Sequence, residues 1–223
     1  LLACRLVDIL GLAGVIVPPN PGNVSAFGLL TVDVRNDYVQ TVVSKHLDLD
    51  LVMDFARKEL RGDATLSLQW KDAAARTLVL DTRDLAIDKI SALDADGKAR
   101  ALDFALATRD DQLGSKLTIQ APQRPVKVRI SYTTSPKASG LQWLTAAQTA
   151  DRKQPFMFSQ SQSIHARSWV PLQDSPAIRF TYKAHVSAPK GLRVVMSALN
   201  DARHPLDGDF SFDQPHPIPS YLM

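Results

Sequence analysis

From Ser44 onward, hydrophobic and polar residues alternate along much of the chain with a period of two. In residues 46–55, apolar side chains occupy every second position from Leu47 to Phe55, and aspartates occupy most positions between them. This period is typical of strands with one buried and one solvated face. Alternation or short apolar runs predict further strands at 64–70, 76–81, 85–93, 117–121, 126–132, 156–160, 164–170, 178–186 and 192–198. Many short strands indicate a mainly β domain of antiparallel sheets packed on each other.

Three details refine this prediction. The segment Asp94-Ala95-Asp96-Gly97 is typical of a hairpin turn in which glycine takes a positive φ. Residues 144–150 are the one helical candidate in this part of the chain. Prolines at 215, 217 and 219 predict that the last segment is extended and lies at a sheet edge.

Residues 1–43 follow a different pattern. Leu6, Ile9 and Leu10 have helical spacing, residues 15–17 form a short apolar run, and Ser25 is placed to cap a second helix over 26–30. We therefore expect a short α-containing segment that is not an independent domain. The remaining residues, 44–223, are enough to bury a core of their own.

The acidic residues exclude several kinds of site. Of 23 acidic side chains only Glu59 is a glutamate, which we place on a turn between two strands, and Cys4 is the only cysteine. The chain therefore contains no internal disulfide, no cysteine zinc cluster and no H-E-x-x-H motif. The net charge of +3 comes from scattered basic residues, which argues against nucleic acid binding. No apolar run is long enough to span a membrane.

Motifs in the second part resemble a known family. The densest is Phe-Ser-Gln-Ser-Gln-Ser-Ile-His-Ala-Arg at 158–167, followed by Pro-x-Gln-Asp-Ser-Pro at 171–176 and Pro-Ile-Pro-Ser-Tyr-Leu at 217–222. Residues 44–223 thus resemble the N-terminal domain of gluzincin zinc aminopeptidases of the leukotriene-hydrolase type. The resemblance implies a saddle-shaped, multi-sheet domain that packs on a thermolysin-like catalytic domain and roofs its active-site cleft.

The same resemblance indicates which residues carry function. In this family the glutamine-rich strand reaches the cleft, which implies that Gln160, Gln162 and Ser163 bind the peptide substrate. Residues 160 and 162 of a strand share one face, and an amide can accept from an ammonium or donate to a carbonyl. The alternative is that both glutamines simply face water. His165, which has no partner at ligand spacing, is interpreted as structural.

The catalytic motifs of the family, H-E-x-x-H and G-x-M-E-N, are absent from the chain. We expect no catalytic residue, no metal ligand and no peptidase activity in this chain alone. Zinc is the expected cofactor of the full-length parent, and the presumed partners are the parent's catalytic zinc domain and a peptide substrate. An isolated chain would expose the surface meant for that domain, so we also expect self-association.

Residues 15–41 resemble a segment of the hydantoinase/oxoprolinase family, without its nucleotide-binding or metal motifs. Two such resemblances in one chain suggest a gene fusion, an assembly artefact or a truncated reading frame. The alternative is a family-specific N-terminal extension.

Three functions are considered. The first is the non-catalytic aminopeptidase domain, the second is a stand-alone β-sandwich binding module, and a vestigial hydantoinase-related enzyme ranks last. Substrate preference, epoxide hydrolysis by the parent, oligomeric state and compartment stay open.

Overall fold

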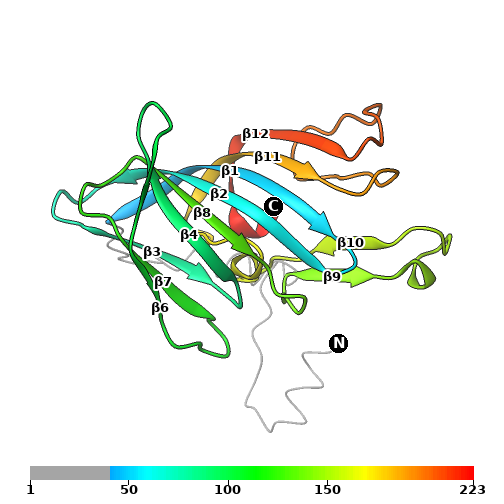
Figure 1. The fold of residues 1–223 in the computed structure, drawn as a ribbon, viewed down its shortest axis with the longest axis horizontal. Helices are drawn as coiled ribbons and strands as arrows, with labels where there is room; N and C mark the ends of the chain where they lie inside the picture. Colours follow the sequence, from blue (N-terminus) through cyan, green and yellow to red (C-terminus); the bar gives the residue numbers. More distant parts are fainter. Residues whose placement is uncertain (1–40) are drawn as a thin grey trace, which may run out of the picture. The chain divides into compact units, whose positions relative to one another are not determined.

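A computed structural model describes residues 41–223, and its largest element is a seven-stranded sheet (Figure 1). Its strand order is β12-β11-β1-β2-β8-β4-β5, and its neighbours are antiparallel except for β1 and β11, which run parallel. The prediction of antiparallel sheets therefore holds with one exception among the described strands. The strands of this sheet are β1 (Val42–Asp54), β2 (Glu59–Trp70), β4 (Ala86–Leu93), β5 (Ala99–Ala101), β8 (Lys127–Thr133), β11 (Arg179–Ser187) and β12 (Asp209–Pro219).

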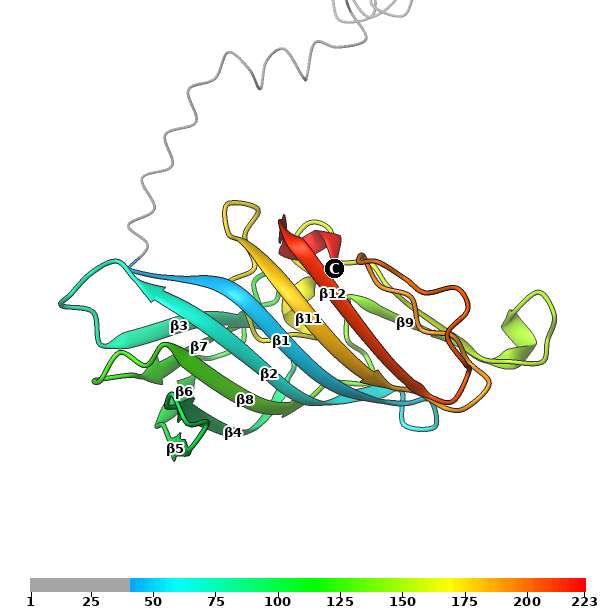
Figure 2. The same cartoon turned by 90° about the horizontal axis from the view of Figure 1, so that it is seen from above.

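Two small sheets lie under opposite ends of the long strands, as the two views together show (Figures 1 and 2). The three-stranded sheet has the order β3-β7-β6, and the other is the hairpin of β9 and β10. Their strands are β3 (Thr77–Thr82), β6 (Phe104–Leu106), β7 (Ser115–Gln120), β9 (Leu141–Leu144) and β10 (Phe156–Ser159). The described helical turns are all 3-10: η2 (Ala146–Gln148), η3 (Ala166–Ser168) and η4 (Ser220–Leu222).

The core lies between the large sheet and the small ones. In β1 the side chains of Leu47, Leu49 and Leu51 are at most 3% exposed, while the aspartates between them face outward. Leu78 of β3 and Ile119 of β7 are completely buried and belong to the same hydrophobic cluster. Each such side chain contributes about 1.5–3 kcal/mol on burial. The predicted alternation in the strands therefore corresponds to an inner and an outer face.

Several local predictions are confirmed. Strands occur near all the predicted positions except 164–170 and 192–198. The hairpin between β4 and β5 has Gly97 at φ 78°. β12, which carries the three prolines, is the edge strand of the large sheet.

Other predictions are wrong. Residues 164–170 contain the turn η3, and 192–198 form no strand because no neighbouring strand in the described residues pairs with them. The helix expected at 144–150 is only the three-residue turn η2. Glu59 is not in a turn: it is the first residue of β2 and pairs with Asp54. The short strands β5, β6 and β9 were not predicted from the sequence. The segment expected at 1–43 lies outside the described residues up to residue 40.

Candidate functional site

Gln160, Gln162 and Ser163 directly follow β10, and all three side chains are exposed. The ladder with β9 extends one residue past the strand, because the Gln160 backbone N–H donates to the Gly140 carbonyl at 2.9 Å. The chain then turns at 162–165 into η3. The peptide bond between Gln162 and Ser163 is cis. The three predicted residues are therefore close together, with Gln160 just before the turn and Gln162 and Ser163 within it.

The prediction that residues 160 and 162 share one face of a strand is wrong. The strand ends at Ser159, and Ser161 points into the protein at 2% exposure. Its hydroxyl accepts a hydrogen bond from the Trp169 indole N–H at 2.9 Å, and its carbonyl accepts one from the His165 N–H at 2.9 Å. These bonds to later residues replace strand pairing and form the turn, so Gln160 and Gln162 meet through the turn rather than through strand alternation.

The polar side chains of this turn make few hydrogen bonds within the described protein. The Gln162 backbone N–H donates to the Gln160 side-chain oxygen at 3.1 Å, which orients the Gln160 amide. Within residues 41–223, the side chains of Gln162 and Ser163 make no hydrogen bond. They offer an amide oxygen, two amide N–H donors and a hydroxyl to a ligand. The group can therefore bind a polar peptide end or an ammonium.

The turn rests on a tightly packed base. The Gly140 N–H donates to the Ser168 hydroxyl at 2.8 Å, and that hydroxyl donates to the His165 carbonyl at 2.7 Å. A side chain at Gly140 would not fit, because its Cβ would lie 2.6 Å from the His165 carbonyl oxygen. Residues 166–170 are all buried. The exposed glutamines are therefore presented by a fixed support.

His165 belongs to this support. Its Nδ1 lies 2.8 Å from the Ser139 hydroxyl and 2.9 Å from a guanidinium nitrogen of Arg83. Because arginine only donates hydrogen bonds, Nδ1 acts as the acceptor in its contact with Arg83. Arg83 also donates to the Gln112 carbonyl. These contacts agree with the structural interpretation of His165.

A buried ion pair between Arg167 and Asp174 lies directly after the turn in the chain. Arg167 is 6% exposed at its side chain and donates from its backbone N–H and from Nε to the Asp174 carboxylate, at 3.1 Å each. The Ser220 hydroxyl donates to the other oxygen of Asp174 at 2.6 Å, which connects η4 to η3. Asp81 lies 3.5 Å from the Arg167 guanidinium, but burial raises its pKa above the usual value. Sequence reasoning did not identify this network.

No group of three or more histidine, cysteine or acidic side chains within residues 41–223 is placed to hold a metal ion. The histidine with the most acidic surroundings is His185 on β11. It lies between Asp50 of β1 at 3.0 Å and Asp209 of β12 at 2.8 Å. These hydrogen bonds, to Asp50 first and then to Asp209, raise the pKa of His185. In the same part of the chain, no helix is long and apolar enough to cross a membrane.

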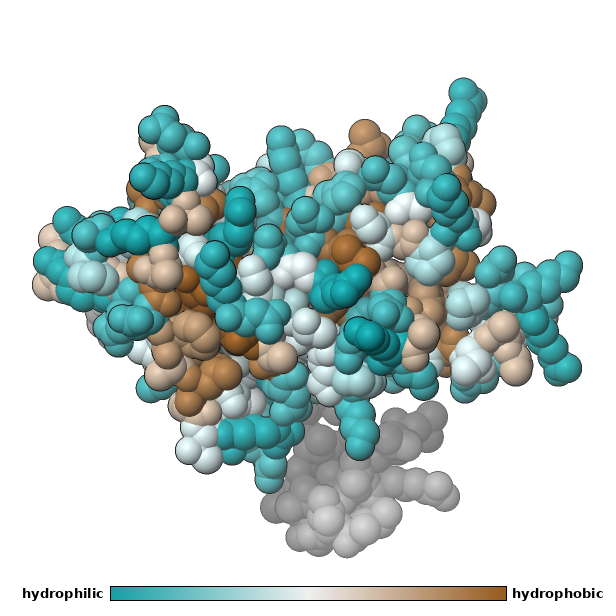
Figure 3. All heavy atoms as spheres, viewed as in Figure 1, coloured by the Kyte–Doolittle hydropathy of each residue, from teal (hydrophilic) through white to brown (hydrophobic). Residues whose placement is uncertain are grey.

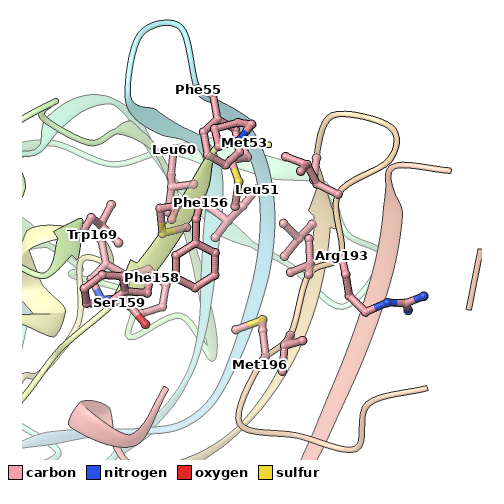
Figure 4. Close-up of a pocket in the computed structure, with 18 of the residues that line it drawn as sticks. Leu51, Met53, Phe55, Leu60, Phe156, Phe158, Ser159, Trp169, Arg193 and Met196 are labelled. Carbon is pink, nitrogen blue, oxygen red and sulfur yellow. The ribbon is translucent and has the colours of Figure 1, made fainter. Parts of the chain in front are cut away.

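An apolar groove of about 650 Å³ begins beside the turn, because Ser159 and Trp169 line it (Figure 4). Its floor includes Leu51 and Met53 of β1 and Leu60 of β2. Sequence reasoning did not identify this groove. The available signal was the alternating apolar segment 192–198, whose residues 192–196 form one wall of the groove and pair with no strand in the described part of the chain.

Comparison with known proteins places this fold in a family. Residues 43–222 match the family model of the peptidase M1 N-terminal domain. Leukotriene A-4 hydrolase of Xenopus laevis is 39% identical over 189 residues, and leucine aminopeptidase 2 of Pyricularia oryzae is 35% identical over 190 residues. These alignments cover 80% and 81% of this chain but 30% of each relative. The chain thus spans less than a third of the length of these relatives.

Solved structures agree. Yeast LTA4 hydrolase in complex with bestatin superposes with a TM-score of 0.73 at 28% identity, over 92% of this chain and 32% of that protein. An M1 zinc metallopeptidase from Deinococcus radiodurans, at 18% identity and a TM-score of 0.59, shares the fold over 81% of this chain and 41% of that protein. The family match begins at residue 43, so the hydantoinase-like resemblance of 15–41 stays a prediction. From the matched family model and the relatives together, the chain belongs to the peptidase M1 N-terminal domain family.

Proposed function

We propose that residues 44–223 are the non-catalytic N-terminal domain of a zinc aminopeptidase, which roofs the active-site cleft and helps to bind the N-terminus of a peptide. The parent reaction is hydrolysis of N-terminal peptide bonds. Membership of the M1 N-terminal family and the similarity to a leucine aminopeptidase support this proposal. So does the length of the relatives, of which this chain covers 30%.

The observation that carries the substrate-binding role is the turn at 160–163. Exposed polar side chains usually move freely, which makes ligand binding costly in entropy. Here the Gln160 amide is oriented by the backbone N–H of Gln162, and the turn is fixed by the buried Ser161 and its bond to Trp169. A preorganised amide loses less freedom when it binds a substrate ammonium or carbonyl.

The proposal places the zinc site outside this part of the enzyme. The described residues contain no group of side chains that fits a zinc site. The chain also contains no H-E-x-x-H motif. In the proposal, zinc and the catalytic base are held by the rest of the parent, and this domain binds and orients substrate.

A chimeric enzyme tests the proposal. This chain replaces the matching N-terminal part of Xenopus laevis leukotriene A-4 hydrolase, and hydrolysis of an aminoacyl p-nitroanilide is followed. Loss of a hydrogen bond to a charged substrate group costs about 1.5–3 kcal/mol, so Gln162→Ala should lower kcat/KM at least about tenfold, mainly through KM. Gln123→Ala, an exposed glutamine elsewhere, is the matched control. Equal kcat/KM values for the two variants would refute the role of Gln162.

Two further results address the domain itself. The isolated chain with added zinc should hydrolyse no aminoacyl anilide, and turnover that a chelator removes would contradict the non-catalytic assignment. A folded chimera without any aminopeptidase activity would instead favour the stand-alone β-sandwich binding module.

A further inference from the structure

All four methionines of the chain line one groove. Met53, Met157, Met196 and Met223 come from four separate segments and meet around the same cavity of about 650 Å³. Phenylalanine and tryptophan side chains complete the lining: Phe55, Phe156, Phe158 and Trp169. Methionine is flexible and polarizable, and it is over-represented at surfaces that adapt to an apolar partner. The composition of this groove is therefore that of a binding surface.

One wall of the groove is the free edge of β10. This strand pairs only with β9 among the described strands, so its other edge has unpaired backbone groups. Phe156 and Phe158 stack with ring centroids 5.9 Å apart and are 51% and 38% exposed. An exposed apolar strand edge is a template for another strand.

The opposite wall is the segment 192–196. Its burial alternates residue by residue, with Leu192, Val194 and Met196 half-buried and the residues between them exposed. This alternation is that of a β-strand, yet within residues 41–223 the backbone groups of 193–195 make no hydrogen bond. The segment thus has the side-chain pattern of a strand without a neighbour to pair with.

The groove also lacks a charge on its inner surface. Arg193 is the one residue of its lining with a charged side chain, and its guanidinium points away from the cavity (Figure 4). That guanidinium donates to the carbonyls of Asp201 at 3.2 Å and His204 at 2.8 Å. A charged side chain in the groove would lose its hydration without gaining a partner. The occupant must therefore be apolar on the side that faces the groove.

We infer that the groove binds an extended, apolar segment of the catalytic part of the parent enzyme, which adds as a strand between β10 and residues 192–196. Unpaired backbone groups on both walls specify an extended polypeptide, since only such a chain can satisfy both edges. The apolar and methionine-rich lining specifies apolar side chains. The assignment of the added strand to the catalytic part of the parent rests on the proposed function. Strand addition rests on the groove alone.

Hydrogen exchange of the full 223-residue chain tests strand addition. The probe is the peptide acetyl-Leu-Val-Leu-Val-Lys-amide. It should slow backbone exchange at 156–159 and 192–196 by about tenfold or more. The matched peptide with both leucines and both valines N-methylated keeps the apolar side chains but loses these ladder donors on both edges, and it should protect neither segment. Equal protection by both peptides, or by neither, would overturn strand addition.

The chimera tests whether the catalytic part of the parent supplies the added strand. In it, 156–159 and 192–196 should be protected without any peptide, and Phe158→Lys should remove that protection. Val79→Lys, which adds the same charge to the exposed apolar face of the three-stranded sheet (Figure 3), should leave it unchanged. A chimera with both segments unprotected would overturn the inference, whatever its activity. Protection together with activity that is insensitive to Gln162→Ala would refute only the proposed substrate site.

Discussion

Replacing Asp174 by alanine should destabilise the domain by about 3–5 kcal/mol, because it leaves the buried Arg167 guanidinium with only the partly exposed Asp81 as an acidic neighbour. The Asp174 side chain is completely buried, and that of Arg167 is 6% exposed. Asp174 accepts four hydrogen bonds at its carboxylate and carbonyl from Arg167 and Ser220. Since small domains are stable by only about 5–15 kcal/mol, this loss is a large share of the total.

Urea unfolding followed by tryptophan fluorescence measures the effect, because Trp169 lies directly after η3. Ser220→Ala should cost less, about 1.5–3 kcal/mol, since it removes one hydrogen bond to a charged group. The double variant Arg167→Met with Asp174→Leu should lose less stability than the two single variants added together, because neither Arg167 nor Asp174 is left buried without the other. A loss below about 1 kcal/mol for Asp174→Ala, or additive single effects, would refute the reasoning.

Three further predictions concern other parts of the domain. The raised pKa of His185 means that its stabilising contribution is complete below the unfolded value near pH 6.5 and is lost as pH rises through the higher folded pKa. Above pH 6.5, the midpoint of urea unfolding should therefore fall less steeply with pH in His185→Gln than in the control variant His216→Gln. Equal slopes for the two variants would contradict this. Gly62→Ala should lower the free energy of unfolding by well over the roughly 1 kcal/mol expected of Gly97→Ala. The new Cβ at residue 62 would lie 1.8 Å from the Asp50 carbonyl oxygen, whereas a Cβ at residue 97 would meet no atom within 4 Å. Similar unfolding midpoints for the two variants would show that the strand moves freely. The isolated chain should self-associate through the β10 edge, so Phe158→Lys should shift it towards the monomer in light scattering, and an unchanged mass would exclude that edge.

Much of the fold could be predicted from local pattern. Strands such as β1 and β8 bury one face against the core, and this burial imposes a period of two on the sequence. The prolines of β12 likewise identify an edge strand, because proline cannot donate to a ladder. The short strands β5 and β6 were missed because all their side chains are exposed, so they carry no alternating burial pattern.

The assignment of Gln160, Gln162 and Ser163 as substrate-binding residues stays a prediction, but the strand geometry expected for them was wrong. An alternating polar pattern at 160–163 resembles a strand, and nothing local shows that Ser161 and Trp169 bond to each other across a turn. The same limitation hid the network of Arg167, Asp174 and Ser220, whose members lie up to 53 residues apart.

By itself, the sequence determined the mainly β fold, the resemblance to aminopeptidase N-terminal domains and the absence of the motifs of a zinc hydrolase. These properties depend on residue types and on periods within a few positions. Only the tertiary structure decided that residues 160–163 form a supported turn, that four distant methionines share one groove and that 192–196 has no pairing partner within residues 41–223. The physical reason is that strand pairing and groove formation depend on contacts between segments far apart in the chain, which a local pattern does not specify.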